Sequence, residues 1–90
     1  MRAYAFKDPG DSSRYCWRGL AIYDNALGQW DAFDLVHYYG WGTAYLGSSP
    51  SLMEVRFTYF PDLIPVRIDQ TPEEIRKAAG LAAGEYEVGV

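Results

Sequence analysis

The stretch QWDAFDLVHYY, Gln29 to Tyr39, decides the fold class of this chain. If it is a strand, Phe33 and Leu35 lie on one face. The opposite face then carries further apolar residues, namely Trp30, Ala32 and Val36. If it is a helix, the apolar residues scatter around the axis, and Asp31 and Asp34 interrupt the most apolar stripe. The β-branched and aromatic content favours a strand over residues 29–39.

The stretches on either side of this segment are also predicted to form strands. Residues 2–7 alternate alanine with aromatic side chains, and residues 14–23 place apolar side chains on both faces, as in a strand covered on both sides. Residues 24–28, DNALG, are expected to close a hairpin. Residues 52–60, LMEVRFTYF, show the most regular alternation in the chain and are predicted to form a strand. Residues 65–68, PVRI, are predicted to form a short edge strand because proline weakens sheet pairing.

Turn residues separate these strands. Residues 8–13, DPGDSS, and 48–51, SSPS, have the composition of loops. Gly40, Gly42 and Gly47 are expected to mark bends or bulges, where the backbone approaches another group closely.

One helix is predicted, over the stretch TPEEIRKAAG, residues 71–80. Thr71 is expected to be the N-cap, Pro72 suits the first helical position, and Glu74 would complete a capping box. Gly80 is expected to end the helix.

The elements together predict an α+β fold in which residues 1–90 form a single compact domain. A small antiparallel sheet of about four to five strands would carry one short C-terminal helix packed on it. The last residues, EYEVGV (85–90), are either a final strand or a tail.

Composition limits the classes of function. A net charge of -4 and a pI near 4.7 argue against direct binding to nucleic acid. No apolar run approaches the roughly 18 residues of a membrane span, and the opening MRAYAFKDPG lacks the apolar core of a signal peptide. Cys16 is the only cysteine, so no internal disulfide can form and a reducing cytoplasm is the expected location.

Catalytic and metal-binding residues are sparse. Cys16, His37 and Asp34 formally supply a nucleophilic set, but RYCWRG around the cysteine resembles neither a nucleophile elbow nor a cysteine-protease signature. One histidine and one cysteine are too few for a metal site, and no lysine follows GWG to make a phosphate-binding loop. We therefore expect neither an enzyme nor a bound cofactor.

The distribution of charge and aromatic residues indicates a binding surface. No lysine or arginine occurs between Gly19 and Val55. Tyrosine and tryptophan are favoured interface anchors, and carboxylates suit a partner rich in arginine and lysine. Tyr38 and Tyr39 cannot both point into one core if they continue the strand, so one of them should be exposed. The predicted protein-binding residues are Asp24, Asp31, Asp34, Tyr38, Tyr39, Trp41 and Tyr45.

These residues support a non-catalytic protein-binding module that covers a basic, nucleic-acid-binding site on a larger protein. It would act as an inhibitor or accessory protein, of the kind that viruses and mobile elements encode against host defence. It could also form a homodimer. The plainer interpretation is that the aromatic residues are core and the aspartates a solvated face.

Two other functions stay open. The first is single-stranded nucleic-acid binding on an aromatic sheet face, helped by Arg14, Arg18, Arg56 and Arg67. The second is a small enzyme or ligand-binding domain with a tyrosine-lined pocket.

Overall fold

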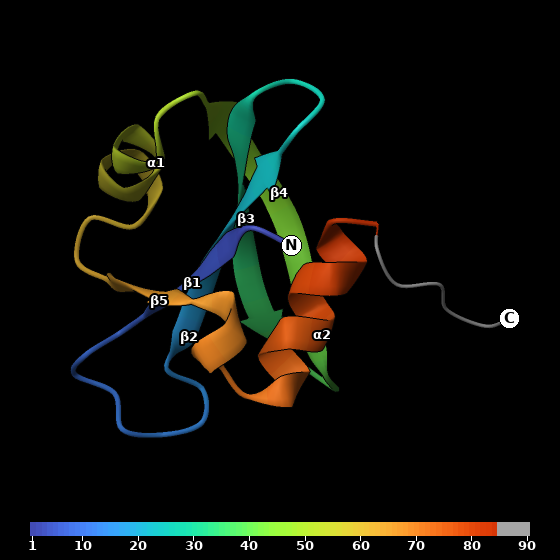
Figure 1. Ribbon diagram of the computed structural model, residues 1–90. Helices are drawn as coiled ribbons and strands as arrows, with labels where there is room; N and C mark the ends of the chain where they lie inside the picture. The colour runs from blue at the N-terminus through green and yellow to red at the C-terminus, as the bar shows by residue number, and fades with distance from the viewer. Residues whose placement is uncertain (85–90) are drawn as a thin grey trace, which may run out of the picture.

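A five-stranded antiparallel sheet with an α-helix on each face makes up the computed structural model, which describes residues 1–84 (Figure 1). The strands are β1 (Ala3–Lys7), β2 (Trp17–Asp24), β3 (Gln29–His37), β4 (Trp41–Ser49) and β5 (Ile64–Arg67). The helices are α1 (Leu52–Tyr59) and α2 (Glu73–Ala82), with a short 3-10 helix, η1 (Ile68–Gln70), before α2. The predicted α+β class is confirmed, whereas the expected strand or tail over 85–90 lies outside the described residues.

The strands are arranged in the order β4-β3-β2-β1-β5. The first four follow one another as an antiparallel meander, and the segment containing α1 then returns the chain to the far side, where β5 pairs with β1. β4 and β5 are therefore the two edges of the sheet. Among residues 1–84, no helix is long and apolar enough to cross a membrane.

The deciding segment is a strand, as predicted. β3 covers Gln29–His37, with Trp30 and Ala32 buried on the side of α1 and Leu35 buried on the side of α2. The hairpin expected over residues 24–28 is also present, and Gly28 adopts the positive φ (62°) that glycine tolerates most easily.

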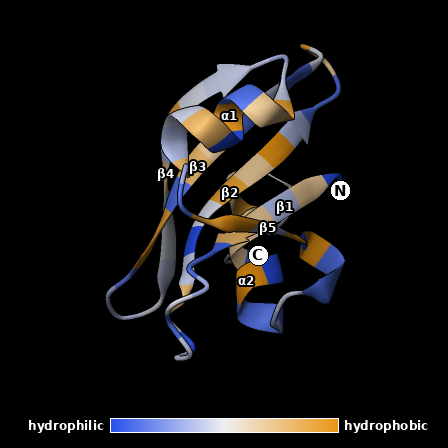
Figure 2. Ribbon diagram, turned by 90° about the vertical axis from the view of Figure 1, so that its left-hand side faces the viewer, coloured by the Kyte–Doolittle hydropathy of each residue, from blue (hydrophilic) through white to orange (hydrophobic). Residues whose placement is uncertain are grey.

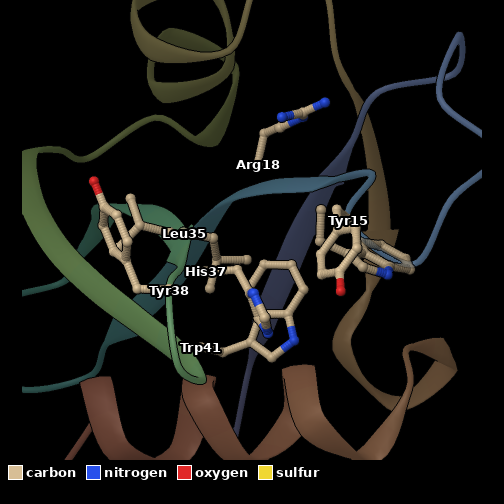
Figure 3. Close-up of a pocket in the computed structure, with 8 residues that line it drawn as sticks. Tyr15, Arg18, Leu35, His37, Tyr38 and Trp41 are labelled. Atoms are coloured by element: carbon tan, nitrogen blue, oxygen red, sulfur yellow. The ribbon is translucent and has the colours of Figure 1, made fainter.

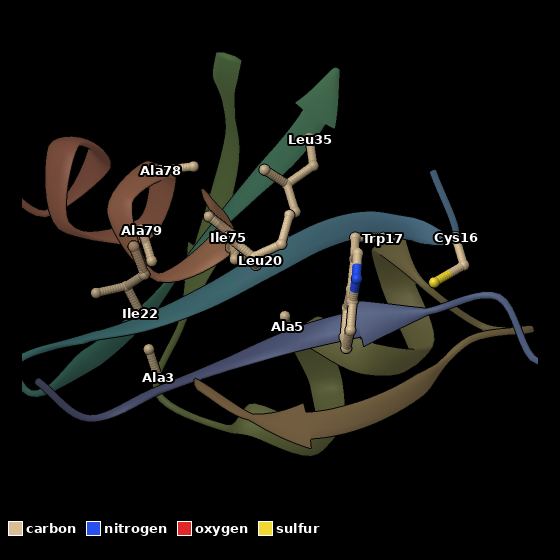
Figure 4. Close-up of a cluster of buried hydrophobic side chains, with 10 residues drawn as sticks. All are labelled: Ala3, Ala5, Cys16, Trp17, Leu20, Ile22, Leu35, Ile75, Ala78 and Ala79. Atoms are coloured by element: carbon tan, nitrogen blue, oxygen red, sulfur yellow. The ribbon is translucent and has the colours of Figure 1, made fainter. Parts of the chain in front are cut away.

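Each face of the sheet has its own hydrophobic core. On one face Leu20 and Ile22 of β2 pack with Ile75 of α2, in the cluster drawn in Figure 4. On the other face Phe6 stacks on Phe60, with ring centroids 4.5 Å apart, next to the buried Val55 of α1. β2 is consequently covered on both sides, as its composition predicted.

Gly19 makes the second core possible. A Cβ at this position would lie 2.2 Å from the Phe60 ring, so only glycine lets the ring approach β2 this closely. The same strand has a bulge: Phe6 pairs with Gly19 and Lys7 with Trp17, which leaves Arg18 without a partner in the ladder. The bulge brings Trp17 onto the α2 face, together with Leu20.

Residues 52–60 were predicted to form a strand, and that prediction is wrong. They form α1, which begins after Ser51, whose Oγ accepts a hydrogen bond from the Glu54 amide at 3.3 Å. Ser51 and Glu54 have the spacing of a capping box, a helix signal that the alternation concealed. The loop expected over 48–51 is also shorter, because β4 continues to Ser49.

The alternation in this segment does not describe its buried face. Met53 and Phe57 are 58% and 62% exposed, although the strand pattern placed them with Val55. The inward residues are Leu52, Val55 and Tyr59, which are spaced as on one face of a helix.

The predicted C-terminal helix is present as α2, but its ends differ from those predicted. Thr71 is buried and its hydroxyl donates to the Ile68 carbonyl at 2.6 Å, so it does not cap the helix. The helical hydrogen bonds instead start at the Pro72 carbonyl, which accepts from the amides of Ile75 and Arg76.

Gly80 lies inside α2, where it is buried against the sheet. The helix ends at Ala82, and Gly84, with a φ of 73°, has the left-handed backbone that commonly follows a helix end.

Candidate functional site

The β3–β4 hairpin carries most of the residues that the sequence indicated. At its tip the Tyr38 amide donates to the Gly40 carbonyl at 3.1 Å, which closes a tight turn. The side chains of Tyr38 and Tyr39 are 85% and 108% exposed. Strand alternation predicted that one of the pair would be exposed. Both are, because the turn follows the end of β3 and alternation no longer applies.

An aromatic cluster lies at the base of the tip (Figure 3). His37 and Trp41 are partners in the β3–β4 ladder, with ring centroids 5.0 Å apart. Tyr15, from the loop before β2, adds a third ring at 4.9 Å from His37. In Figure 3 the Tyr38 ring extends away from these three.

The cluster borders an open cavity of about 520 Å³. Its lining residues are Tyr15, Trp17, Arg18, Leu35, Val36, His37, Tyr38 and Trp41. The Trp41 Nε1–H is buried and has no hydrogen-bond acceptor among the described residues. Because this nitrogen is closed to solvent, a bound acceptor would reach it only if the neighbouring side chains moved.

Tyr15 and Trp17 also belong to this site, although the sequence did not indicate them. Tyr15 is brought in from a loop by long-range packing, and Trp17 faces the cavity because of the bulge at Arg18. Neither placement leaves a local signal in the sequence.

Tyr45 is held in a fixed orientation on the α2 face of the sheet. Its ring meets the edge of Phe33 with centroids 5.7 Å apart, and its hydroxyl bonds to the Ser48 hydroxyl. Ser48 donates its proton to Asp31 at 2.6 Å, so the Tyr45 hydroxyl must be the donor to Ser48. Tyr45 is nevertheless 61% exposed. These two hydrogen bonds form a relay from Tyr45 through Ser48 to Asp31, which links two predicted site residues and fixes an exposed ring.

The remaining predicted carboxylates lie apart from this relay. Asp24 is in the β2–β3 turn, where its Oδ1 accepts from the amides of Ala26 and Leu27. This turn and the Tyr38–Tyr39 tip are at opposite ends of β3 (Figure 1). Asp34 is on the α1 face of β3, because it alternates with Leu35. The structure thus divides the predicted site into a tip, a Tyr45–Asp31 relay and two separate aspartates.

The arginines of the nucleic-acid hypothesis do not share one groove. Arg14 pairs with Glu74 at 2.9 Å, Arg18 with Asp11 at 3.0 Å, and Arg67 with Asp69 at 2.6 Å. Hydrogen bonds from Ser13 and the charge of Arg18 hold the pKa of Asp11 below its ordinary value, so this carboxylate stays charged beside Arg18.

Metal binding has no support in the described residues. Residues 1–84 contain no group of three or more histidine, cysteine or acidic side chains placed to hold a metal ion.

Comparison of the chain with protein-family models, curated proteins and solved structures finds no match. A function can therefore be inferred only from the geometry of the chain itself.

Proposed function

We propose that this chain is a small protein-binding module whose contact surface is the β3–β4 hairpin. The observation that carries the proposal is the near-complete exposure of Tyr38 and Tyr39 at the hairpin tip. Tyrosine is a frequent interface anchor because it offers a large contact area and loses little conformational entropy on binding.

The rest of the hairpin supports the same function. The Phe33 contact and the Ser48 bond already fix Tyr45, so a partner would not bear the cost of ordering this ring. The cavity beside Trp41 could receive a side chain of the partner.

Charge suggests the kind of partner. The hairpin contributes Asp31 and Asp34 and contains no lysine or arginine. A partner with a basic surface is therefore favoured, and by covering a basic nucleic-acid-binding site the module would act as an inhibitor or accessory protein. Cys16 is buried and unpaired among the described residues, which fits a reducing cytoplasm as the location.

Comparative affinity capture tests this proposal. The full chain, a Tyr38→Ser/Tyr39→Ser variant and a Leu27→Ser variant would be used as baits in lysate from the source organism. Leu27 is a matched control, because it is exposed on the β2–β3 turn at the opposite end of the sheet. We expect a protein that the parent and the Leu27 variant retain and the tyrosine variant loses. Equal capture by all three baits would contradict the proposal.

The cavity favours a ligand-binding site as a second candidate function. Its lining of tyrosine, histidine and tryptophan side chains would suit a planar aromatic ligand. Screening small aromatic carboxylates and amides by NMR tests this function. A ligand that shifts the signals of His37 and Trp41, and that a Trp41→Phe variant no longer binds, would support it. No hit across the screen would remove it.

A further inference from the structure

The outer edge of β4 is open. β4 is nine residues long and ends the sheet, and within residues 1–84 no strand pairs with its outer side. An edge strand presents alternate backbone N–H and C=O groups that can bind another strand. The only irregularity is the bulge at Leu46, so the pairing from Trp41 to Tyr45 stays regular.

Apart from the bulge at Leu46, this edge lacks proline and charge, two features that usually block such pairing. Its sequence, WGTAYLGSS, contains no proline and no charged residue. Figure 2 draws β4 at one side of the sheet in mostly pale colours, because its side chains are neither charged nor, for the most part, strongly apolar. Gly42 and Ala44 are exposed and small, so a long side chain of an added strand can pass over them toward β3.

The strand next to β4 makes this edge attractive to cations. Asp34 of β3 pairs with Ala44 across the ladder and lies on the same face of the sheet. A strand added to β4 would lie about 10 Å from β3, within reach of a lysine or arginine side chain directed toward Asp34. Lys77 lines a groove with Tyr39 and Trp41 on the opposite, α2 face, so it does not compete for Asp34.

We infer that the β4 edge binds an extended segment of the partner that carries lysine or arginine at alternate positions. The segment would add a sixth strand to the sheet and place its cations on the α1 face, beside Asp34. This inference rests on the proposed protein-binding function and specifies the chemistry of the partner. A second copy of the chain fits less well, because its own β4 would bring no cation to this half of the sheet.

Peptide binding to the full chain tests the inference. The probe is a short synthetic peptide that alternates valine and lysine, and its controls are a valine–glutamate peptide and the lysine peptide with alternate backbone amides N-methylated. NMR titration and hydrogen exchange of the labelled chain would report the site. We expect saturable binding of the lysine peptide, new protection of alternate β4 amides, and binding at least about tenfold weaker for both controls.

Paired substitutions at one edge position sharpen the test. Ala44→Lys should weaken binding of the lysine peptide about tenfold or more, whereas Ala44→Glu should strengthen it severalfold. Met53→Lys is the matched control: it adds the same charge on the exposed side of α1 and should change the affinity less than about twofold. Circular dichroism would verify that all three variants fold.

Several results would overturn the inference. One is the absence of saturable binding, and another is equal affinity for the N-methylated peptide. Protection of the outward-facing β4 amides, those not bonded to β3, in the free protein would show that the chain itself covers the edge, and a dimer seen by analytical ultracentrifugation would show that a second copy does. If a captured partner needs Tyr38 and Tyr39 but binds the Ala44→Lys variant as it binds the parent, this inference fails while the protein-binding proposal stands.

Discussion

The two edges of this sheet are protected to very different degrees. β5 has four residues, contains Pro65, and carries Arg67 in an ion pair with Asp69. β4 has nine residues with no proline and no charge, and it begins directly after the exposed tyrosine tip. Short length, proline and charge are the usual means by which proteins prevent edge-to-edge association. The difference indicates that one edge is closed and the other is available for binding.

The β5 edge also depends more on the hydrophobic core than the β4 edge does. β5 follows α1 and Phe60, and Phe60 packs between Phe6 and Gly19. The β4 half is held by its ladder with β3 and by Trp41, which packs against the core, whereas Gly42, Ala44, Tyr45 and Leu46 are exposed. Substitutions should therefore damage stability on one side of the molecule and binding on the other.

The largest expected effect is that of Phe60→Ala. Removing a buried ring should lower the free energy of unfolding by about 3–5 kcal/mol and accelerate hydrogen exchange in β1 and β5. Urea denaturation followed by circular dichroism measures the loss. Tyr39→Ala removes an aromatic ring at the open tip and should stay within about 0.5 kcal/mol of the parent. Similar losses for both variants would remove the contrast between the two sides.

The second prediction concerns charge beside the open edge. Asp34→Lys should slow association with the captured partner severalfold to about tenfold, and the difference from the parent should shrink as salt is added. Asp24→Lys makes the same change in net charge at the β2–β3 turn, far from the tip. Surface plasmon resonance would compare the two association rate constants. Equal slowing by both variants would mean that only the overall charge matters.

The third prediction concerns α1, which lies in the segment that connects β4 to β5. Ser51→Ala removes the oxygen that caps α1 and should cost about 0.5–2 kcal/mol of stability. Thr58→Ala removes a hydroxyl from an exposed position of the same helix and should cost nothing, because alanine favours helix. Thermal and urea unfolding would separate these outcomes. A Ser51 variant as stable as the parent would show that packing alone holds the start of α1.

The sequence predicted β1, β2, β3, β5 and α2, but it predicted neither β4 nor α1. The β-branched and aromatic content identified β3 correctly, because apolar side chains of that strand pack into the core on each face of the sheet. The alternation over 52–60 was misleading, since Met53 and Phe57 turned out to be exposed and burial follows the helical spacing of Leu52 and Val55. The Ser51–Glu54 spacing was the better signal, because it reports a local hydrogen bond rather than a tertiary contact.

For the candidate site, the sequence identified the residue types but not how they are grouped. The exposed tyrosines follow from their place in a turn, which local sequence can indicate. The separation of Asp24 from the tip depends on strand length, and the arrival of Tyr15 depends on a loop that packs across the sheet. The role of Ser48 in holding Tyr45 depends on a bulge that shifts the β3–β4 register by one residue.

The smallest expected effect tests whether Pro65 and the charge of Arg67 prevent another strand from pairing with the outer edge of β5. A Pro65→Thr/Arg67→Thr variant restores a backbone donor and removes a charge, so β5 should gain a weak site for the valine–lysine peptide. With four residues against nine, this site should bind at least about tenfold more weakly than β4. NMR titration would detect it as shifts of the β5 amides that appear in the variant and not in the parent. If the parent already shows those shifts, proline and charge do not protect the β5 edge. The absence of proline and charge would then no longer be a reason to regard the β4 edge as a binding site.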